Sequence, residues 1–151
     1  MPQIVLVHPE IPPNTGNIAR TCAATGTPLH LVQPLGFDLS DKYLKRAGLD
    51  YWPSVDLHLH ESLEDFWQQA QAVGGRLIGF SAKGRCRYTE IAYQSDDWLI
   101  FGKESQGLSA ETLQHCNSVV TIPMDKGHVR SLNLSVSAAV GLFEAIRQIG
   151  P

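Results

Sequence analysis

Polar and basic residue types gather in four short segments of this sequence. They are HPEIPPNTGN (8–17), AKGRCR (82–87), GKESQG (102–107) and PMDKGHVRSLN (123–133). Each combines glycine with hydrogen-bonding side chains, which suits a site where main-chain and side-chain groups together hold a polar ligand. Arg20 follows the first segment and ends the stretch NTGNIAR. A helix capped by Asn14 needs no such cation, so we expect Arg20 to belong to a site shared with the other segments.

Several common chemistries lack their signatures here. The sequence has no G-x-x-x-x-G-K-[ST] loop, and no G-x-G-x-x-G follows a strand-like run. It has no G-x-S-x-G elbow either. What remains is a set of backbone donors beside four apolar residues, and such a pocket suits a flat heterocycle held by main-chain groups. The four are Phe80, Ile122, Met124 and Leu132.

No metal site is predicted. Cys22, Cys86 and Cys116 are odd in number and lack C-x-x-C spacing, which supports neither a disulfide framework nor a zinc knuckle. The segment LHLH (57–60) could present a histidine pair to a metal. Strand alternation favours the other interpretation, in which the two leucines face the core and both histidines face water.

Short apolar runs between helical patterns must position these segments. Several runs are apolar on both faces, as in a covered parallel sheet. The runs predicted as strands are 4–7, 29–32, 76–81, 98–101 and 119–122. Alternation of strands and helices predicts an α/β fold with a mostly parallel sheet and helices on both faces. All four polar segments then emerge at the carboxyl edge of that sheet, where ligands of open α/β folds bind.

Local signals mark the ends of the helices. One helix begins near Asn14 and ends before Gly26, a second starts after Ser62, and a third after Ser109. Ser131 or Asn133 could cap the last helix, LSVSAAVGLFEAIRQI (134–149). Its apolar stripe is predicted to include Ala139, Leu142, Phe143, Ile146 and Ile149. This stripe could pack internally or form a subunit interface.

Three motifs, in order, carry a family resemblance. They are N-x-G-N-I-x-R (14–20), F-G-x-E-x-x-G-L (101–108) and I-P-M followed by R-S-L-N-L-S (122–135). Over nearly its whole length the chain resembles the SPOUT methyltransferases, in the branch that methylates RNA ribose 2′-hydroxyls. The opening segment and RAGLDYW (46–52) are similar to the minimal bacterial enzymes that act on the wobble cytidine or uridine of leucine tRNAs.

The resemblance implies a fold, a cofactor and partners. We expect a C-terminal trefoil knot, which composition and periodicity alone would argue against. S-adenosylmethionine is the expected cofactor, a tRNA anticodon loop the substrate, and a homodimer the assembly.

The resemblance also assigns roles to residues. It implies catalytic roles for Arg20, Glu104 and Asn133, with Glu104 orienting a basic or backbone group rather than acting as a base. The cofactor would be bound by a further set: Phe80, Gly102, Ile122, Met124, Ser131 and Leu132. For Phe80 and Ile122, a structural role in the core is a strong alternative to cofactor binding. Turn geometry alone would explain Gly102.

Bulk properties are consistent with this assignment. A length of 151 residues predicts one domain, 1–151, and no run is long and apolar enough to span a membrane. We therefore expect a cytoplasmic protein. The net charge of −3 means that RNA contact must come from local basic clusters at 42–46, 83–87 and 126–130. A non-catalytic RNA-binding module, a methyltransferase for another ribose and a flavodoxin-like nucleotide-binding domain stay open as alternatives.

Overall fold

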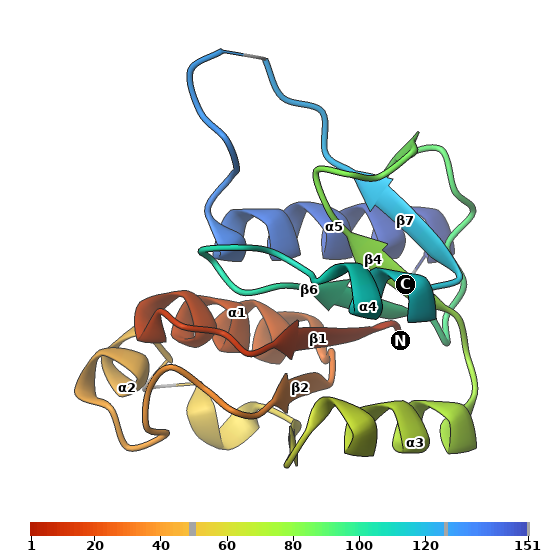
Figure 1. The fold of residues 1–151 in the computed structure, drawn as a ribbon. Helices are drawn as coiled ribbons and strands as arrows, with labels where there is room; N and C mark the ends of the chain where they lie inside the picture. The colour runs from red at the N-terminus through yellow and green to blue at the C-terminus, as the bar shows by residue number, and fades with distance from the viewer. Residues whose placement is uncertain (49–50, 126, 151) are drawn as a thin grey trace.

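A single parallel sheet forms the centre of the protein. The computed structural model describes residues 1–48, 51–125 and 127–150. Seven strands pair in the order β3-β2-β1-β6-β4-β7-β5, and every pairing is parallel (Figure 1). The strands are β1 (Gln3–Val7), β2 (Leu29–Val32), β3 (Leu57–His60), β4 (Leu77–Phe80), β5 (Cys86–Arg87), β6 (Trp98–Phe101) and β7 (Ser118–Thr121). All five predicted strands are confirmed, whereas the two-residue β5 lies in a segment expected to be loop.

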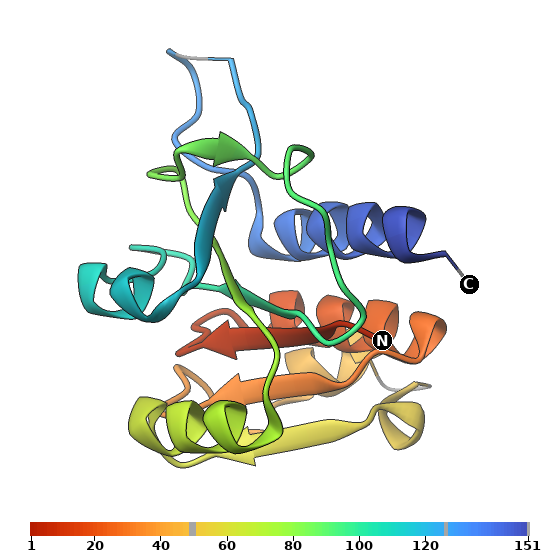
Figure 2. The ribbon, with the colours of Figure 1, turned by 90° about the vertical axis from the view of Figure 1, so that its right-hand side faces the viewer.

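Helices cover both faces of the sheet, as predicted (Figure 2). They are α1 (Pro12–Thr25), α2 (Lys42–Gly48), α3 (Leu63–Val73), α4 (Ala110–His115) and α5 (Leu134–Ile149), with a short 3-10 helix η1 (Trp52–Ser54). Helices α1 and α5 pack on the face that carries Ile4 and Leu6. Helices α3 and α4 pack on the other face, with Val5 and Val7, because successive side chains of a strand point to opposite sides.

Most of the predicted helix ends are confirmed. Gly26 ends α1 in the left-handed conformation at φ 67°. The hydroxyls of Ser62 and Ser109 accept hydrogen bonds from the first turns of α3 and α4. Asn133, one of the two residues considered, caps α5. Helix α2 was not predicted, because KYLKR was interpreted only as a basic cluster.

The beginning of α1 differs from the prediction. The cap position is Ile11, Pro12 and Pro13 open the helix, and Asn14 is buried within the first turn. Proline suits this place, since its fixed φ is helical and its missing N–H would have had no partner in the helix. The side chain of Asn14 is therefore free for contacts other than capping.

The apolar stripe of α5 is divided between core and solvent. Leu142 is 1% exposed, as predicted for the core, but Phe143 is 52% exposed. The predicted grouping of the two was wrong in this respect, because adjacent helical positions differ by about 100° in direction. Where α5 crosses the sheet, a Cβ on Gly141 would lie 2.7 Å from the Phe80 ring, so the close approach requires glycine there.

The prediction that both histidines of LHLH face water was wrong for His60, whereas the side chain of His58 is 40% exposed and lies 2.9 Å from Asp56 Oδ1. His60 is buried at 5% exposure, whereas Leu59 is 45% exposed. The reason is the place of β3 at the sheet edge, where α3 covers the histidine face and sets Phe66 against His60. His60 also shares a 2.9 Å hydrogen bond with His30 of β2, whose other ring nitrogen contacts Gln3 Oε1.

Because His30 and His60 are buried, we expect the protein to lose stability in acid. Burial, with a further contribution from His58 and His60, lowers the pKa of His30 to about 3, and burial also lowers the pKa of His60. Both histidines bind protons more readily in the unfolded chain than in the folded one. The unfolding free energy therefore falls as pH drops below about 6.5, and the slope is up to about 1.4 kcal/mol per pH unit for each histidine. Urea unfolding between pH 7 and 5 measures this slope. His30→Phe keeps a ring in place and should give a shallower slope; an unchanged slope would assign the acid sensitivity to other groups.

Candidate functional site

Glu104 is the centre of a hydrogen-bond network at the carboxyl edge of the sheet. Its Oε1 accepts from the backbone N–H of Glu10 at 2.9 Å, and its Oε2 from that of Ile11 at 2.8 Å. The amide of Asn14 donates to the same Oε2 at 3.1 Å. The carboxylate thus lies against the positive end of α1, where a negative charge is favoured. Glu104 orients backbone groups, as expected for it.

Asn14 extends this network to the last helix. Because a carboxylate only accepts, Asn14 must turn its NH₂ toward Glu104 and its oxygen away. That oxygen accepts from Nδ2 of Asn133 at 3.0 Å. The Oδ1 of Asn133 is then left to accept from the backbone N–H of Ser135 at 2.8 Å, which caps α5. Residues from all three sequence motifs are joined in one chain of hydrogen bonds.

A second contact runs in the opposite direction between the same two loops. Oε1 of Glu10 accepts from the backbone N–H of Ser105 at 3.0 Å and from its hydroxyl at 2.7 Å. These bonds lower the pKa of Glu10. The loop after β1 and the loop after β6 therefore hold each other by reciprocal carboxylate contacts.

Gly102 is required by the path of its own loop. A Cβ there would lie 2.1 Å from the backbone carbon of Gly107, which no real contact allows. Gly107 adopts φ 67°, and its N–H donates to Lys103 O at 2.8 Å. The positive φ considered from the sequence thus accounts for Gly107, whereas Gly102 is required by the close approach of the backbone at Gly107.

The other residues expected at the cofactor fall into two groups. Phe80 is a core residue, 7% exposed and stacked on Phe101 with ring centroids 4.5 Å apart. Ile122 and Met124 are half-buried, while Ser131 and Leu132 are exposed. The segment that joins β7 to α5 projects from the body of the protein (Figures 1 and 2). Among the described residues, 122–125 and 130–132 take part in no backbone–backbone hydrogen bond, which leaves main-chain donors and acceptors for a ligand.

Arg20 lies apart from the network. It is six residues beyond Asn14 on α1, about 9 Å along the axis and about 120° from it in direction. Its exposed guanidinium lies over the ring of Tyr51, with Cζ 4.7 Å from the centroid. The structure therefore joins Glu104 and Asn133 but leaves Arg20 on another side of α1.

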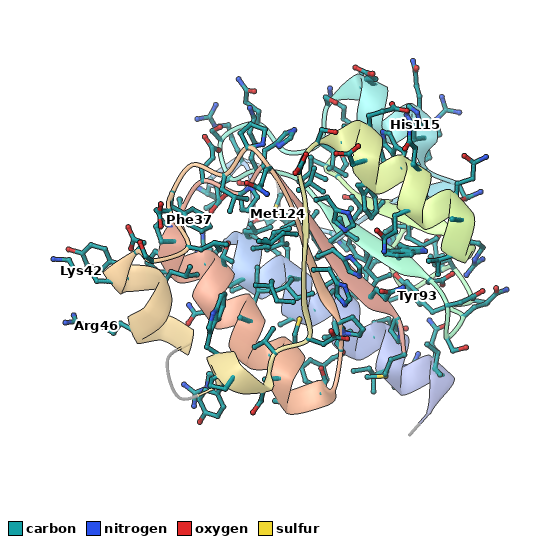
Figure 3. All side chains as sticks on the ribbon, turned by 90° about the horizontal axis from the view of Figure 1, so that it is seen from below. Phe37, Lys42, Arg46, Tyr93, His115 and Met124 are labelled. Atoms are coloured by element: carbon teal, nitrogen blue, oxygen red, sulfur yellow. The ribbon has the colours of Figure 1, made fainter. Side chains whose placement is uncertain are left out.

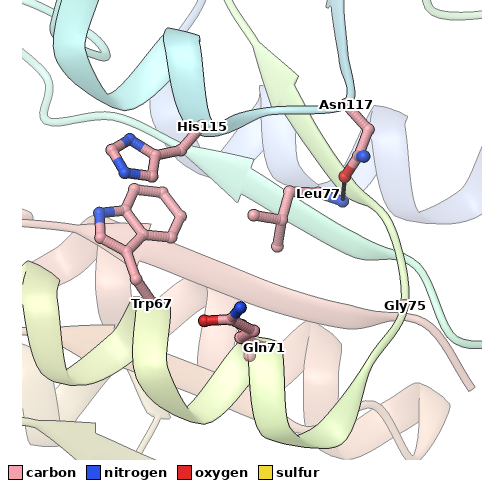
Figure 4. A pocket seen from close by; sticks show the side chains of 7 residues that line it. Trp67, Gln71, Gly75, Leu77, His115 and Asn117 are labelled. Carbon is pink, nitrogen blue, oxygen red and sulfur yellow. Dashed lines mark hydrogen bonds between the residues drawn. The ribbon is translucent and has the colours of Figure 1, made fainter.

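Neither of two cavities in the described part of the chain is lined by the predicted cofactor residues. The larger, about 300 Å³, lies between α3 and α4 at the amino ends of β4 and β7, away from the motifs (Figure 4). The rings of Trp67 and His115 stack on one side of this cavity, with their centroids 4.5 Å apart. The smaller, about 140 Å³, lies beside the loop after β6; its lining includes His8, Lys103 and Gln106.

Sequence reasoning missed the roles of Asn14 and Glu10. Asn14 was interpreted as a cap, although it stands in the first motif; its burial among polar neighbours was not predictable from local pattern. Glu10 was quoted only as part of a segment. A signal was present, because HPEIPPN places a carboxylate and an amide around a double proline that opens a helix.

The described residues contain neither a metal-binding cluster nor a membrane-spanning helix. No group of three or more His, Cys, Asp or Glu is arranged there to hold a metal ion. None of the helices in that part of the chain has the length and apolar character of a membrane span.

Glu104→Gln tests whether the carboxylate holds the loops. The variant places an NH₂ against donors that need an acceptor, so we expect a loss of about 1.5 to 3 kcal/mol in unfolding free energy. Urea denaturation measures it, with the exposed Glu90→Gln as the control. Equal stability of Glu104→Gln and the wild type would show that the network contributes little.

Known proteins resemble the chain over its full length. Residues 1–143 match the model of the SpoU rRNA methylase family. A Synechocystis protein named putative tRNA (cytidine(34)-2′-O)-methyltransferase is 58% identical, over 99% of this chain and 97% of its own length.

Solved structures give the same result. One, described as giving structural insights into the 2-OH methylation of C/U34 on tRNA, superposes with a TM-score of 0.93 at 51% identity, covering 98% of this chain and 95% of the other. An AdoMet-bound rRNA methyltransferase from Sinorhizobium meliloti superposes with a TM-score of 0.91 at 28% identity, covering 99% and 57%. The sequence motifs, the parallel sheet and these matches agree: the chain belongs to the SpoU methylase family.

Proposed function

We propose that the protein methylates the ribose 2′-hydroxyl of the wobble nucleotide of tRNA, cytidine 34 or uridine 34, with S-adenosylmethionine as methyl donor. The observation that carries this proposal is the junction of Glu104, Asn14 and Asn133, which joins three motif segments at one sheet edge. An identity of 58%, over 99% of this chain, with a relative named for that reaction supports the same conclusion. We further propose leucine tRNAs as the substrates and the cytoplasm as the place of action.

The chemistry requires little of the protein beyond alignment and charge. S-adenosylmethionine, when bound, would supply an activated methyl group for O2′ and leave as S-adenosylhomocysteine, and a phosphate oxygen or water would take the hydroxyl proton. A guanidinium stays charged and is no base. We propose that Arg20 grips the phosphate beside the acceptor ribose through two N–H groups and favours negative charge on O2′.

The cofactor is proposed to bind through main-chain groups. Backbone atoms at Phe80, Gly102, Ile122 and Leu132 would hold the adenosine, with Met124 and Ser131 beside them. The unpaired backbone groups at 122–125 and 130–132 fit a ligand recognised in this way. The sheet ends nearby, because Phe80 and Phe101 close β4 and β6.

Exposed cations would contact the RNA. Lys42 and Arg46 point outward from α2 (Figure 3), and Lys83, Arg85 and Arg87 are exposed beyond β4. Arg130 is exposed as well, while Lys126 and the side chain of Lys45 lie outside the described residues. A wobble nucleotide stands in a single-stranded loop, which leaves its ribose accessible.

The remaining features implied by the resemblance stay proposals. We propose that residues 1–151 form one methyltransferase domain whose C-terminal part is knotted as a trefoil. Methylation of another tRNA or rRNA ribose is the second candidate. A non-catalytic binding module would not need Arg20 and Glu104, both of which are present.

We propose a homodimer in which Arg20 acts at the cofactor bound by the partner subunit. Val136 and Phe143 are about half exposed, and they are seven residues apart, so both lie on one apolar face of α5 that suits an interface. Arg20 and Asn133 lie on different sides of α1 within one chain, and a second chain can bring them together.

The activity is tested with labelled cofactor and total bacterial tRNA, followed by nuclease digestion and mass spectrometry. We expect label on the ribose at position 34. Arg20→Ala should lower methyl transfer by about 10²- to 10³-fold and leave cofactor affinity unchanged. Label on a base atom would exclude ribose methylation, and absence of label on any RNA would favour the binding module. Normal turnover by Arg20→Ala would remove its proposed role.

Mixed dimers test the arrangement across subunits. Arg20→Ala and Asn133→Ser subunits, each impaired alone, are co-expressed with different tags and purified as heterodimers. If the site is shared, one of its two centres is intact, and about half the wild-type rate returns. A heterodimer as inactive as its parents would place both residues in one subunit's site, and a monomer in sedimentation would exclude the dimer.

A further inference from the structure

The contact between Arg20 and Tyr51 has properties that a purely structural contact would not need. Arg20 is exposed, and Tyr51 is 38% exposed, so their contact is not part of the hydrophobic core. They come from different parts of the chain, α1 and the turn before η1, yet the guanidinium carbon lies 4.7 Å from the ring centroid. A charge over an aromatic face is attracted by the ring quadrupole.

Tyr51 is held firmly although its ring is exposed. Its carbonyl accepts from the N–H of Ser54 at 2.8 Å, which forms the turn of η1. The next residue, Trp52, packs against the main core cluster. The ring is therefore presented from a fixed base, so it can restrict a long, flexible side chain.

The contact leaves the charge of Arg20 available. Among residues 1–48, 51–125 and 127–150, no carboxylate forms an ion pair with it. A carboxylate partner would occupy the N–H groups that a phosphate needs, whereas an aromatic ring attracts the cation without accepting conventional hydrogen bonds from those groups. The arrangement restricts the guanidinium and keeps its donors free.

We propose that Tyr51 is a positioning residue for methyl transfer, holding the Arg20 guanidinium where it meets the RNA phosphate. This inference rests on the function proposed above for Arg20. It assigns a role in the reaction to the segment before η1, which lies outside the three motifs. The aromatic ring, and not the hydroxyl, is the effective group, since the contact is made by the ring.

Three variants test the role. Tyr51→Leu removes the ring, Tyr51→Phe keeps it, and His115→Leu is the control, because the exposed ring of His115 also makes a ring contact, with Trp67 at a centroid distance of 4.5 Å, and lies away from the motifs. Methyl transfer is measured in single turnover with saturating RNA and cofactor, and urea midpoints verify folding. We expect Tyr51→Leu to be about two- to fivefold slower, the range that an exposed cation–π contact supplies, and the other two to match the wild type.

Two further measurements separate positioning from structure. In an Arg20→Ala background, Tyr51→Leu should have no additional effect on the rate. The Arg20 Nε–H resonance, which needs no activity, should lose its ring-current shift in Tyr51→Leu. Wild-type rates for Tyr51→Leu, equal losses in Tyr51→Phe, or equal slowing without Arg20 would each overturn the proposal. A wild type that transfers no methyl group would instead refute the proposed function, and this inference with it.

Discussion

A carboxylate can accept hydrogen bonds but cannot donate them, and that constraint at Glu104 sets the direction of every bond in the network. Its two oxygens take the N–H groups that open α1 and the amide of Asn14. Asn14 must then present its oxygen to Asn133, and Asn133 must present its own oxygen to the first turn of α5. One ionised side chain thereby specifies the orientation of two amides and the beginning of two helices.

The sheet makes this network possible. Strands β1 and β6 are adjacent and parallel, so the loops that follow them leave the same edge side by side. Helices α1 and α5 share one face, which brings the first turn of one to the cap of the other. The bonds that Ser105 donates to Glu10, and those that Glu10 and Ile11 donate to Glu104, then fix the two loops in register. Beyond this region the segment from β7 to α5 is largely exposed, which is consistent with the cofactor-binding role proposed for it.

Sequence reasoning succeeded where the determinants are local. The apolar runs predicted the bounds of β2 and β6 correctly. Gly26, Ser62 and Ser109 marked helix ends correctly because their contacts are with residues only a few positions away. The catalytic and cofactor assignments came from the resemblance, and they stay proposals.

The failures at the site and in LHLH involve partners distant in sequence. Asn14 bonds to residues 90 and 119 positions away, so its role could not be derived from its neighbours. His60 of LHLH was misplaced because alternation shows which residues share a face but not which face a helix covers. Arg20 was expected among the loops, but its recorded contact is with Tyr51, because its direction from α1 depends on where α2 and η1 pack.

The central claim is that Glu104 and Asn133 act as one unit although their side chains bond only through Asn14. A double-mutant cycle on the unfolding free energy tests it, with Glu104→Gln, Asn133→Ser and both together. Serine retains a helix cap but lacks the amide donor, so the cycle isolates the link to Asn14. We predict a coupling energy of at least about 0.5 kcal/mol. Effects that add to within about 0.3 kcal/mol would show two independent contacts and contradict the account.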